Sequence, residues 1–280
     1  MFTNVQWPAI TDWDAMYDNA PAIPKGHEWP QRWVDPAQTA RETFLAAGRA
    51  KIGVKYGDRP RNRYDLFLPD DVPRGVVIFV HGGFWMGLDE SYWSHFAQGP
   101  LAHGFAVAVP TYTLAPEARI SEMTREIAQA ISHAARDIAG PIHLCGHSAG
   151  GHLVTRMVVE NGPLAPEVSG RIKQVLSVSG LHDLRPMLKY WRNKTLHLDL
   201  TEAVRESPAL LAPQPGVRLT CWAGAMETPE FLRQNALLAN IWRGLGSATS
   251  CVEEPMRHHF NILDGLTDPH HPMSLTLCAP

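Results

Sequence analysis

The alternation of apolar and polar residues divides the chain into an N-terminal arm and a longer region of strands and helices. Two runs, 52–56 and 63–68, alternate between polar and apolar positions and are followed by turn-forming residues at 69–71. This pattern predicts an antiparallel hairpin. Continuous apolar runs follow at 76–80, 106–109 and 142–145, which is typical of parallel strands buried on both faces.

Helical periods lie between and after these strands. The clearest covers 120–139, where Ser121 and Glu122 mark the start and Gly140-Pro141 marks the end. Further along, the pattern predicts helices at 149–160 and 231–245, and strands at 175–178, 217–222 and 248–253. Strands that alternate with helices indicate an α/β fold: a doubly wound, mostly parallel sheet with an N-terminal antiparallel hairpin and helices on both faces.

The remaining segments fit one domain over 1–280. Residues 1–50 are rich in Trp, Pro and Asp, and only 36–50 has a helical period, so we expect an arm packed on the domain. The stretch 181–215 is rich in loops and is a candidate for a small cap region. The tail around His270-His271 lies between prolines, and we expect it to be mobile.

Composition narrows the class of partner. A net charge of −3, without a Lys/Arg-rich block, argues against nucleic acid, and the apolar runs are far shorter than a membrane helix. The start Met1-Phe2-Thr3-Asn4 lacks the pattern of a secretory signal, so we expect a cytoplasmic protein. The four widely spaced cysteines are expected to be reduced, mostly core thiols. A small-molecule substrate is the expected partner; the oligomeric state is left open, with a homodimer among the options.

A candidate nucleophile stands at Ser148. The sequence Gly146-His147-Ser148-Ala149-Gly150 follows the apolar run at 142–145 and opens a helix, which is the strand-turn-helix context of a nucleophile elbow. Glycines suit the flanks because the turn is sharp and strained. We therefore predict a serine hydrolase of the α/β-hydrolase fold.

A second motif supplies candidate donors for an oxyanion. The run 76–80 leads into His81-Gly82-Gly83-Phe84-Trp85, which resembles the loop whose backbone N–H groups face a developing negative charge. Gly82, Gly83 or Phe84, together with Ala149, are the expected donors. We expect His81 to have a structural role.

The general base should come last in the chain. His259 directly follows the final predicted strand and is preferred to its neighbour His258. The acid should lie between Ser148 and the base, and Glu227 follows the strand before the last helix. Glu230 is the second candidate for the acid and Asp183 the third, although a turn or cap role is the simpler interpretation of Asp183.

Taken together, these segments resemble the arylformamidases (kynurenine formamidases) and their bacterial esterase-like relatives among the α/β-hydrolases. The resemblance covers nearly the whole chain and rests on 12–19, 56–57, 64–69, 81–85, 146–153, 179–184, 228–231 and 259–260. This family usually has Asp in a D-S-P-E-F stretch, whereas this chain has Glu227-Thr228-Pro229-Glu230-Phe231.

The resemblance implies hydrolysis of N-formylkynurenine or a related aryl formamide through a covalent acyl-Ser148 intermediate, without cofactor or metal. A carboxylesterase for short-chain or aryl esters is the alternative. A catalytically inactive binding protein would lack some of these motifs, and a metal-dependent formamidase would need converging ligands. The expected pocket walls are aromatic, with Trp85, Tyr112 and Phe260 as substrate-binding candidates beside Phe84, Trp93, Tyr190 and Trp191.

Overall fold

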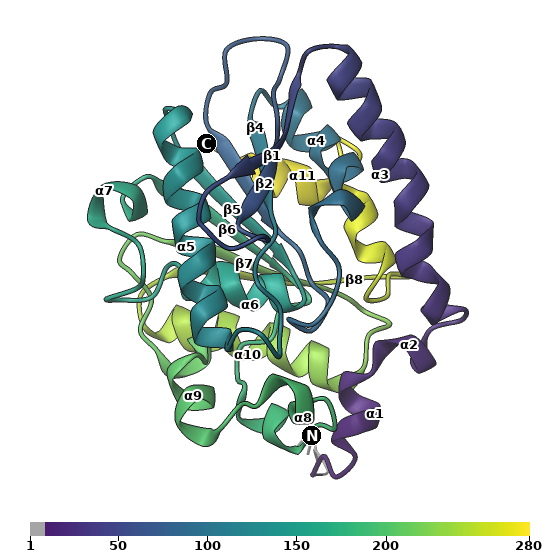
Figure 1. The fold of residues 1–280 in the computed structure, drawn as a ribbon. Helices are drawn as coiled ribbons and strands as arrows, with labels where there is room; N and C mark the ends of the chain where they lie inside the picture. The colour runs from purple at the N-terminus through teal and green to yellow at the C-terminus, as the bar shows by residue number, and fades with distance from the viewer. Residues whose placement is uncertain (1–8) are drawn as a thin grey trace, which may run out of the picture.

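An eight-stranded sheet forms the centre of the protein (Figure 1), in a computed structural model that describes residues 9–280. Residues 1–4, on which the expected absence of a secretory signal rested, lie outside the described part. The strand order is β1-β2-β4-β3-β5-β6-β7-β8. The strands are β1 Ala50–Lys55, β2 Arg63–Phe67, β3 Val76–Val80, β4 Ala106–Pro110, β5 Ile142–His147, β6 Ile172–Val178, β7 Arg218–Gly224 and β8 Ala248–Glu254.

The predicted hairpin is confirmed. β1 pairs antiparallel with β2, and β2 pairs antiparallel with β4. The six strands β3 to β8 are parallel to one another. Because parallel strands point the same way, the carboxyl ends of β3, β5, β6 and β7 meet at one edge of the sheet. Loops from four strands can therefore contribute to one site there.

Helices cover both faces of the sheet, as predicted. The first face packs Ile78 and Leu144 against helices α5 Ile120–Asp137, α6 Ala149–Arg156 and α10 Pro229–Gly244. The opposite face packs Val77 and Phe79 against helices α3 Trp29–Ala46, α4 Gln98–Ala102 and α11 Pro272–Leu277. Successive residues of β3 thus enter different cores, which explains why its apolar run is continuous.

Two terminal predictions need correction. The arm helix begins at Trp29 and not near residue 36, because Pro30 occupies the first turn, where a missing N–H costs nothing, and Pro36 is tolerated inside the helix. The tail around His270-His271 does not extend freely but packs on the domain. His271 caps α11 by accepting a hydrogen bond from the Met273 amide, and Met273 and Leu277 are buried.

The cysteines are all free, as expected. Cys145, Cys221 and Cys278 are buried, whereas Cys251 is exposed because β8 lies at the edge of the sheet. Burial raises the pKa of the Cys145 and Cys221 thiols, which keeps both protonated.

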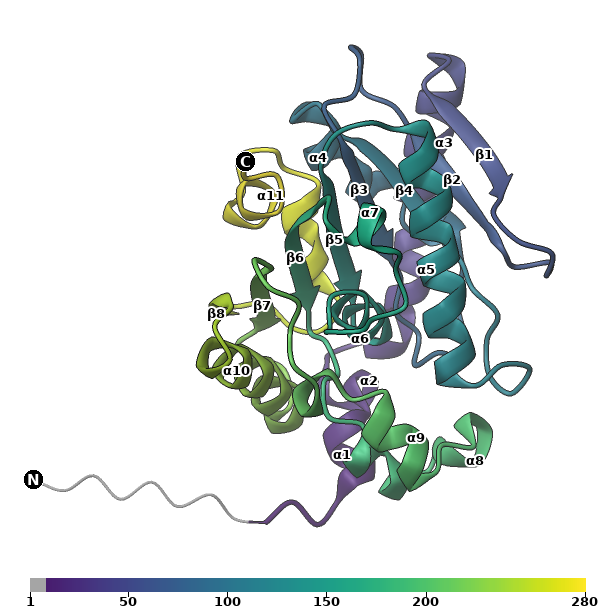
Figure 2. The ribbon, with the colours of Figure 1, turned by 90° about the vertical axis from the view of Figure 1, so that its left-hand side faces the viewer.

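Short helices gather below the carboxyl ends of the strands (Figure 2). The arm contributes α1 Trp13–Tyr17, α2 Asn19–Ala22 and η1 Gly26–Glu28, and the 181–215 region contributes η4 Arg185–Lys189, α8 Asn193–Leu196, α9 Leu200–Arg205 and η5 Pro208–Leu210. The Trp191 amide donates a hydrogen bond to Asp14 across 2.9 Å. These two segments, far apart in sequence, therefore enclose the same end of the sheet. The other short helices are η2 Glu90–Tyr92, η3 Ser94–Ala97, α7 Pro166–Ser169 and η6 Asn261–Leu266.

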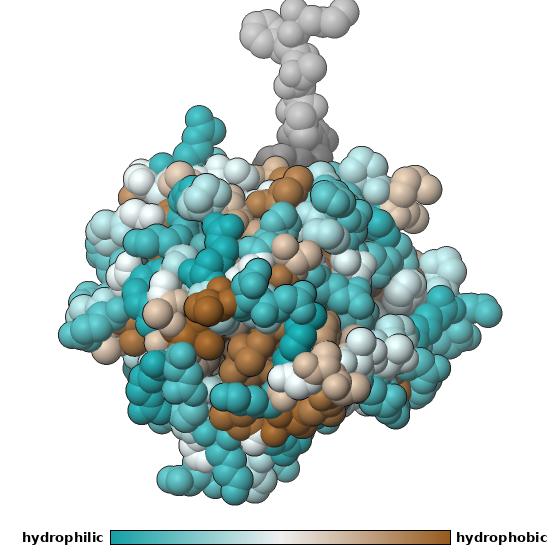
Figure 3. Space-filling view, turned by 90° about the horizontal axis from the view of Figure 1, so that it is seen from above, coloured by the Kyte–Doolittle hydropathy of each residue, from teal (hydrophilic) through white to brown (hydrophobic). Residues whose placement is uncertain are grey.

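The outer surface is mostly polar. Seen from above (Figure 3), hydrophilic side chains dominate and apolar ones gather in a limited group in the lower half of the view. Large apolar side chains that are exposed, such as Leu45, Val72 and Met256, come from separate parts of the chain, a distribution normal for globular proteins. Over residues 9–280, no helix is both long and apolar enough to cross a membrane.

Candidate active site

Ser148 occupies a strained turn between β5 and α6. Its backbone has φ 56° and ψ −117°, a conformation that residues with a side chain rarely adopt, and its amide donates to the Val178 carbonyl across 2.8 Å. The side chain is 2 % exposed. The turn therefore lifts Ser148 out of the strand and fixes it at the amino end of a helix, as the elbow motif predicted.

The flanking glycines are required by packing. A Cβ on Gly150 would lie 1.9 Å from the Val80 carbonyl oxygen, and a Cβ on Gly146 would lie 2.2 Å from the Gly150 oxygen. Both distances are far inside van der Waals contact with backbone that cannot move away. The two glycines thus allow the helix to approach β3 and close the turn around Ser148.

His259 and Glu227 meet at the same end of the sheet. The Nδ1 atom of His259 lies 2.7 Å from Glu227 Oε2, and both side chains are buried. An ionised carboxylate can only accept, so Nδ1 carries the proton and Nε2 presents a lone pair. The His259 ring is fixed by Phe231, with centroids 4.5 Å apart, and by His147, at 4.7 Å.

Glu227 is held from its other side as well. Its Oε1 accepts hydrogen bonds from Ser179 Oγ at 2.6 Å and from the Gly224 amide at 2.8 Å. Ser179, which the sequence analysis named only within the stretch 179–184 and not as a site residue, is buried and has a positive φ of 52°. Three donors therefore fix the position of this one carboxylate, and the carboxylate in turn orients the imidazole.

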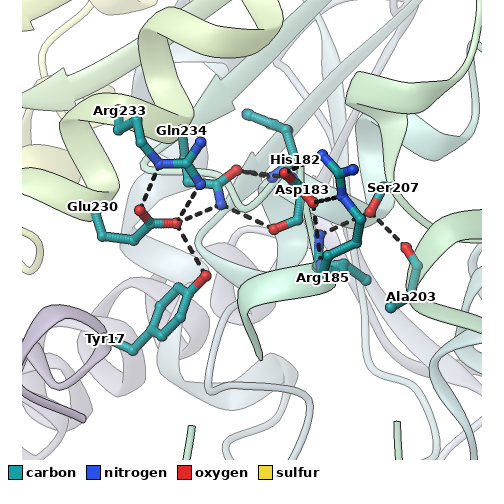
Figure 4. Close-up of polar contacts among 10 residues, drawn as sticks. Tyr17, His182, Asp183, Arg185, Ala203, Ser207, Glu230, Arg233 and Gln234 are labelled. Carbon is teal, nitrogen blue, oxygen red and sulfur yellow. Dashed lines mark hydrogen bonds and ion pairs between the residues drawn. The ribbon is translucent and has the colours of Figure 1, made fainter. Parts of the chain in front are cut away.

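The two other acid candidates have different surroundings. Glu230 accepts from Tyr17, Arg233 and Gln234 in a network that joins α1 to α10 (Figure 4). Asp183 accepts hydrogen bonds from the Arg185 amide and guanidinium, the turn role that its sequence context suggested. Of the three carboxylates, Glu227 is the one that contacts His259.

The loop after β3 has an unusual backbone. Gly83, Phe84 and Trp85 have successive positive φ values of 107°, 50° and 58°. In the part of the chain that the structure describes, the amide nitrogens of Gly82, Gly83, Phe84 and Ala149 donate to no protein acceptor. Gly83 and Phe84 line the same cavity as Ser148. Unpaired amides beside a serine are suited to hold a negatively charged oxygen.

Four of the predicted pocket walls lie elsewhere. Tyr190 is buried against Tyr17, and Trp191 is exposed at the surface; neither lines the cavity. Trp85 and Tyr112 are fully buried and do not line the cavity, because Trp85 packs edge-on against His152 and Tyr112 stacks on His81. Both side chains pack in the core beneath the loop that follows β3. His81, expected to be structural, is buried with Nδ1 2.7 Å from the Gly82 carbonyl oxygen, and burial lowers its pKa to about 4.

The remaining histidines of interest have structural partners. The Nδ1 of His258 accepts from the Phe260 amide at 3.2 Å, and its ring packs edge-on against Trp29. His143 and His147 are four positions apart in β5, which separates them by about 13 Å. Over residues 9–280, no group of three or more His, Cys, Asp or Glu could hold a metal ion.

The cavity beside Ser148 and His259 has a volume of about 270 Å³. Its apolar walls include the expected Phe84, Trp93 and Phe260, together with Trp33, Met86 and Leu88. A larger hollow of about 950 Å³ lies over α5 and has mainly charged and polar walls. The smaller cavity is therefore the one in which an aromatic group and the serine can meet.

Sequence reasoning missed several polar residues of this cavity. Asp18 and Asn19 come from the arm, Arg192 from the start of α8, and His147 from the end of β5. The stretch 12–19 was noticed only as part of the arm. Nothing in the local sequence shows that the arm returns to the carboxyl ends of the strands, which is a tertiary property.

The fold and this site define a hydrolase of the α/β-hydrolase superfamily. A family model named BD-FAE matches residues 64–211, and the chain belongs to this family. Kynurenine formamidase of Danio rerio is 29% identical over 94% of this chain and 96% of its own length. Kynurenine formamidase of Salmo salar is 30% identical over 81% of each chain.

A solved structure from Silicibacter sp. TM1040, provisionally named a thioesterase, has a similar fold over almost the whole length. It is 40% identical, with a TM-score of 0.91, and the match covers 96% of this chain and 99% of that one. Relatives with different names thus share one scaffold, and the names alone do not choose between amide and ester substrates.

Proposed function

We propose that this protein hydrolyses a small aryl formamide, of the N-formylkynurenine type, through a covalent acyl-Ser148 intermediate. One observation carries the proposal: a single cavity holds Ser148 at a strained turn and His259 with its Nδ1 on the Glu227 carboxylate. These features support an activated serine nucleophile, whose base is a histidine oriented by a carboxylate.

In the first half of the reaction, His259 Nε2 takes the hydroxyl proton as Ser148 Oγ bonds to the formyl carbon. The carbonyl oxygen becomes negatively charged and is stabilised by the amides of the 82–84 loop and Ala149, whose loss costs about 3–4 kcal/mol per donor in other hydrolases. His259 then gives its proton to the amine nitrogen as the C–N bond breaks. The aryl amine leaves and formyl-Ser148 remains.

In the second half, His259 deprotonates a water molecule, which attacks the formyl-serine. The collapse of this intermediate returns the proton to Ser148 Oγ and releases formic acid, which ionises to formate in water. Glu227 holds the imidazole in one tautomer and stabilises the imidazolium that forms twice in the cycle. His259 carries the proton in each transfer between Ser148, the amine and water, and none of these steps needs a metal or cofactor.

The formamide substrate is supported by the relatives and by the cavity. Two relatives that match most of the chain are named kynurenine formamidase. The cavity has aromatic side chains on several sides and about 270 Å³ of space, which suits a substituted benzene ring with a small acyl group.

A second candidate is hydrolysis of short-chain or aryl esters. The solved relative that is 40% identical carries a thioesterase name, and an ester would use the same nucleophile, base and oxyanion donors. The two candidates use the same chemistry and differ in the acyl group and the leaving group that the cavity accepts.

The deciding experiment measures kcat/KM for N-formylkynurenine and for p-nitrophenyl acetate, with Ser148→Ala as the blank. A preference for the formamide by orders of magnitude supports the proposal. Turnover of the ester alone would leave the hydrolase chemistry in place and assign the protein to the second candidate. Activity in both assays should survive a metal chelator.

A further inference from the structure

The cavity beside Ser148 contains two opposite charges that do not neutralise each other. Arg192 and Asp18 both line it, yet within residues 9–280 neither side chain forms an ion pair. Burial raises the pKa of Tyr190 to about 12, and both charges act on this phenol, Arg192 lowering its pKa and Asp18 raising it. The two charged groups therefore border one cavity without pairing with each other.

Arg192 is held in place without a carboxylate. Its Nε donates to the Tyr190 hydroxyl at 2.7 Å, and its guanidinium packs over the rings of Trp191, at 4.5 Å, and Phe84, at 5.5 Å. These contacts fix the plane of the guanidinium and leave its terminal N–H donors without an acceptor in the described chain. A planar cation with free paired donors suits a carboxylate.

A third polar group is unpaired and buried. Asn19 lines the cavity at 3 % exposure, and its Nδ2 has no hydrogen-bond partner among residues 9–280. A buried donor without a partner costs free energy, so it is expected to serve a ligand oxygen.

The arm that carries Asp18 and Asn19 is firmly attached. The neighbouring Tyr17 donates to Glu230 at 3.0 Å, and Glu230 also accepts from Arg233 and Gln234 (Figure 4). The position of these polar groups relative to Ser148 is therefore set by a buried network and not by a loose loop.

From these contacts we infer that the cavity selects substrates that carry an α-amino acid zwitterion, with Arg192 binding the carboxylate, Asp18 the ammonium group and Asn19 a substrate oxygen. This inference rests on the proposed function, since it concerns the leaving group of the same reaction. It assigns specificity to residues from the arm and from the 181–215 region, outside the motifs that carry the chemistry.

The test compares two formamides that differ only in the zwitterion: N-formylkynurenine and 2-formamidoacetophenone. The wild-type protein is expected to prefer N-formylkynurenine in kcat/KM, and Arg192→Gln and Asp18→Asn should each reduce that preference roughly 10- to 100-fold, mainly through KM. Arg205→Gln is the matched control, because Arg205 is exposed in the same region and does not line this cavity. It should keep the wild-type preference.

Each outcome decides a separate question. Equal turnover of the two formamides, or variants that keep the wild-type preference, would overturn the zwitterion subsite while leaving the formamidase proposal intact. If the wild-type protein hydrolyses neither formamide, the proposed function fails. The subsite is then tested by inhibition of p-nitrophenyl acetate hydrolysis, where kynurenine should inhibit more strongly than 2-aminoacetophenone, and equal inhibition would refute it.

Discussion

Replacing Glu227 by Gln exchanges one carboxylate oxygen, a hydrogen-bond acceptor, for an NH₂ group, which is a donor. The carboxylate accepts from Ser179 Oγ at 2.6 Å, from the Gly224 amide at 2.8 Å and from His259 Nδ1 at 2.7 Å. A glutamine must keep its single oxygen toward Ser179 and Gly224, and its NH₂ group then faces His259. An NH₂ group can pair only with an unprotonated Nδ1, which moves the imidazole proton to Nε2.

In that tautomer the nitrogen that should take the Ser148 proton is already protonated. The same carboxylate-to-amide change in serine proteases lowers kcat about 10⁴-fold with the geometry intact, which corresponds to about 5 kcal/mol in the barrier. We expect a loss of 10³- to 10⁴-fold in kcat for Glu227→Gln, measured by steady-state hydrolysis of p-nitrophenyl acetate. Circular dichroism and thermal unfolding of the same samples show whether the variant is folded.

Glu230→Gln is the comparison, since Glu230 lies three positions further on but contacts Tyr17, Arg233 and Gln234 instead of His259. It should lower stability more than kcat. A folded Glu227→Gln protein that keeps kcat within tenfold of the wild type would refute the reasoning, and a larger kcat loss in Glu230→Gln would move the acid to that position.

Three further predictions test the scaffold. Gly150→Ala places a Cβ 1.9 Å from the Val80 oxygen, so it should lower the unfolding free energy by about 2–3 kcal/mol or prevent folding, as measured by urea denaturation. Tyr17→Phe removes the bond to Glu230 and should raise KM for N-formylkynurenine several-fold with a smaller effect on kcat; an unchanged KM would contradict the anchoring role of the arm. Burial lowers the pKa of His152 to about 4, so the folded state holds this ring neutral, and its contribution to stability is lost as pH falls from about 6.5 toward 4. His152→Gln should therefore reduce the loss of unfolding free energy between pH 7.5 and 5.5 by about 1 kcal/mol, and an unchanged pH dependence would refute this.

Much of the fold could be predicted because its signals are local. The apolar runs of β3, β4 and β5 stand out because each strand is buried on both faces, and α5 shows a full helical period between clear stop signals. The arm was harder to predict, since Pro30 and Pro36 interrupt the pattern of α3 and hide its first turns. The tail was misjudged because its buried contacts, through Met273 and Leu277, are made to distant parts of the chain.

The candidate site, like the fold, has parts that are set by local sequence and parts that are set by contacts between distant segments. The elbow around Ser148 and the loop after β3 are short motifs whose glycines are demanded by contacts within a few ångströms, so sequence alone locates them. The residues that line the cavity cannot be read from local sequence, because an aromatic residue beside a motif can face the cavity or the core. Trp85 and Tyr112 face the core, whereas Trp33 and Arg192 reach the cavity from distant segments. Such placements depend on tertiary packing, which no spacing rule encodes.

Covalent labelling shows directly whether Ser148 is the nucleophile. The protein would be incubated with diisopropyl fluorophosphate, residual p-nitrophenyl acetate hydrolysis followed, and the modified peptide located by mass spectrometry. If Ser148 is the nucleophile, one adduct per chain forms, on Ser148, with activity lost in proportion to labelling and no adduct in Ser148→Ala. Complete inactivation with the label on another residue, or an active Ser148→Ala protein, would contradict it.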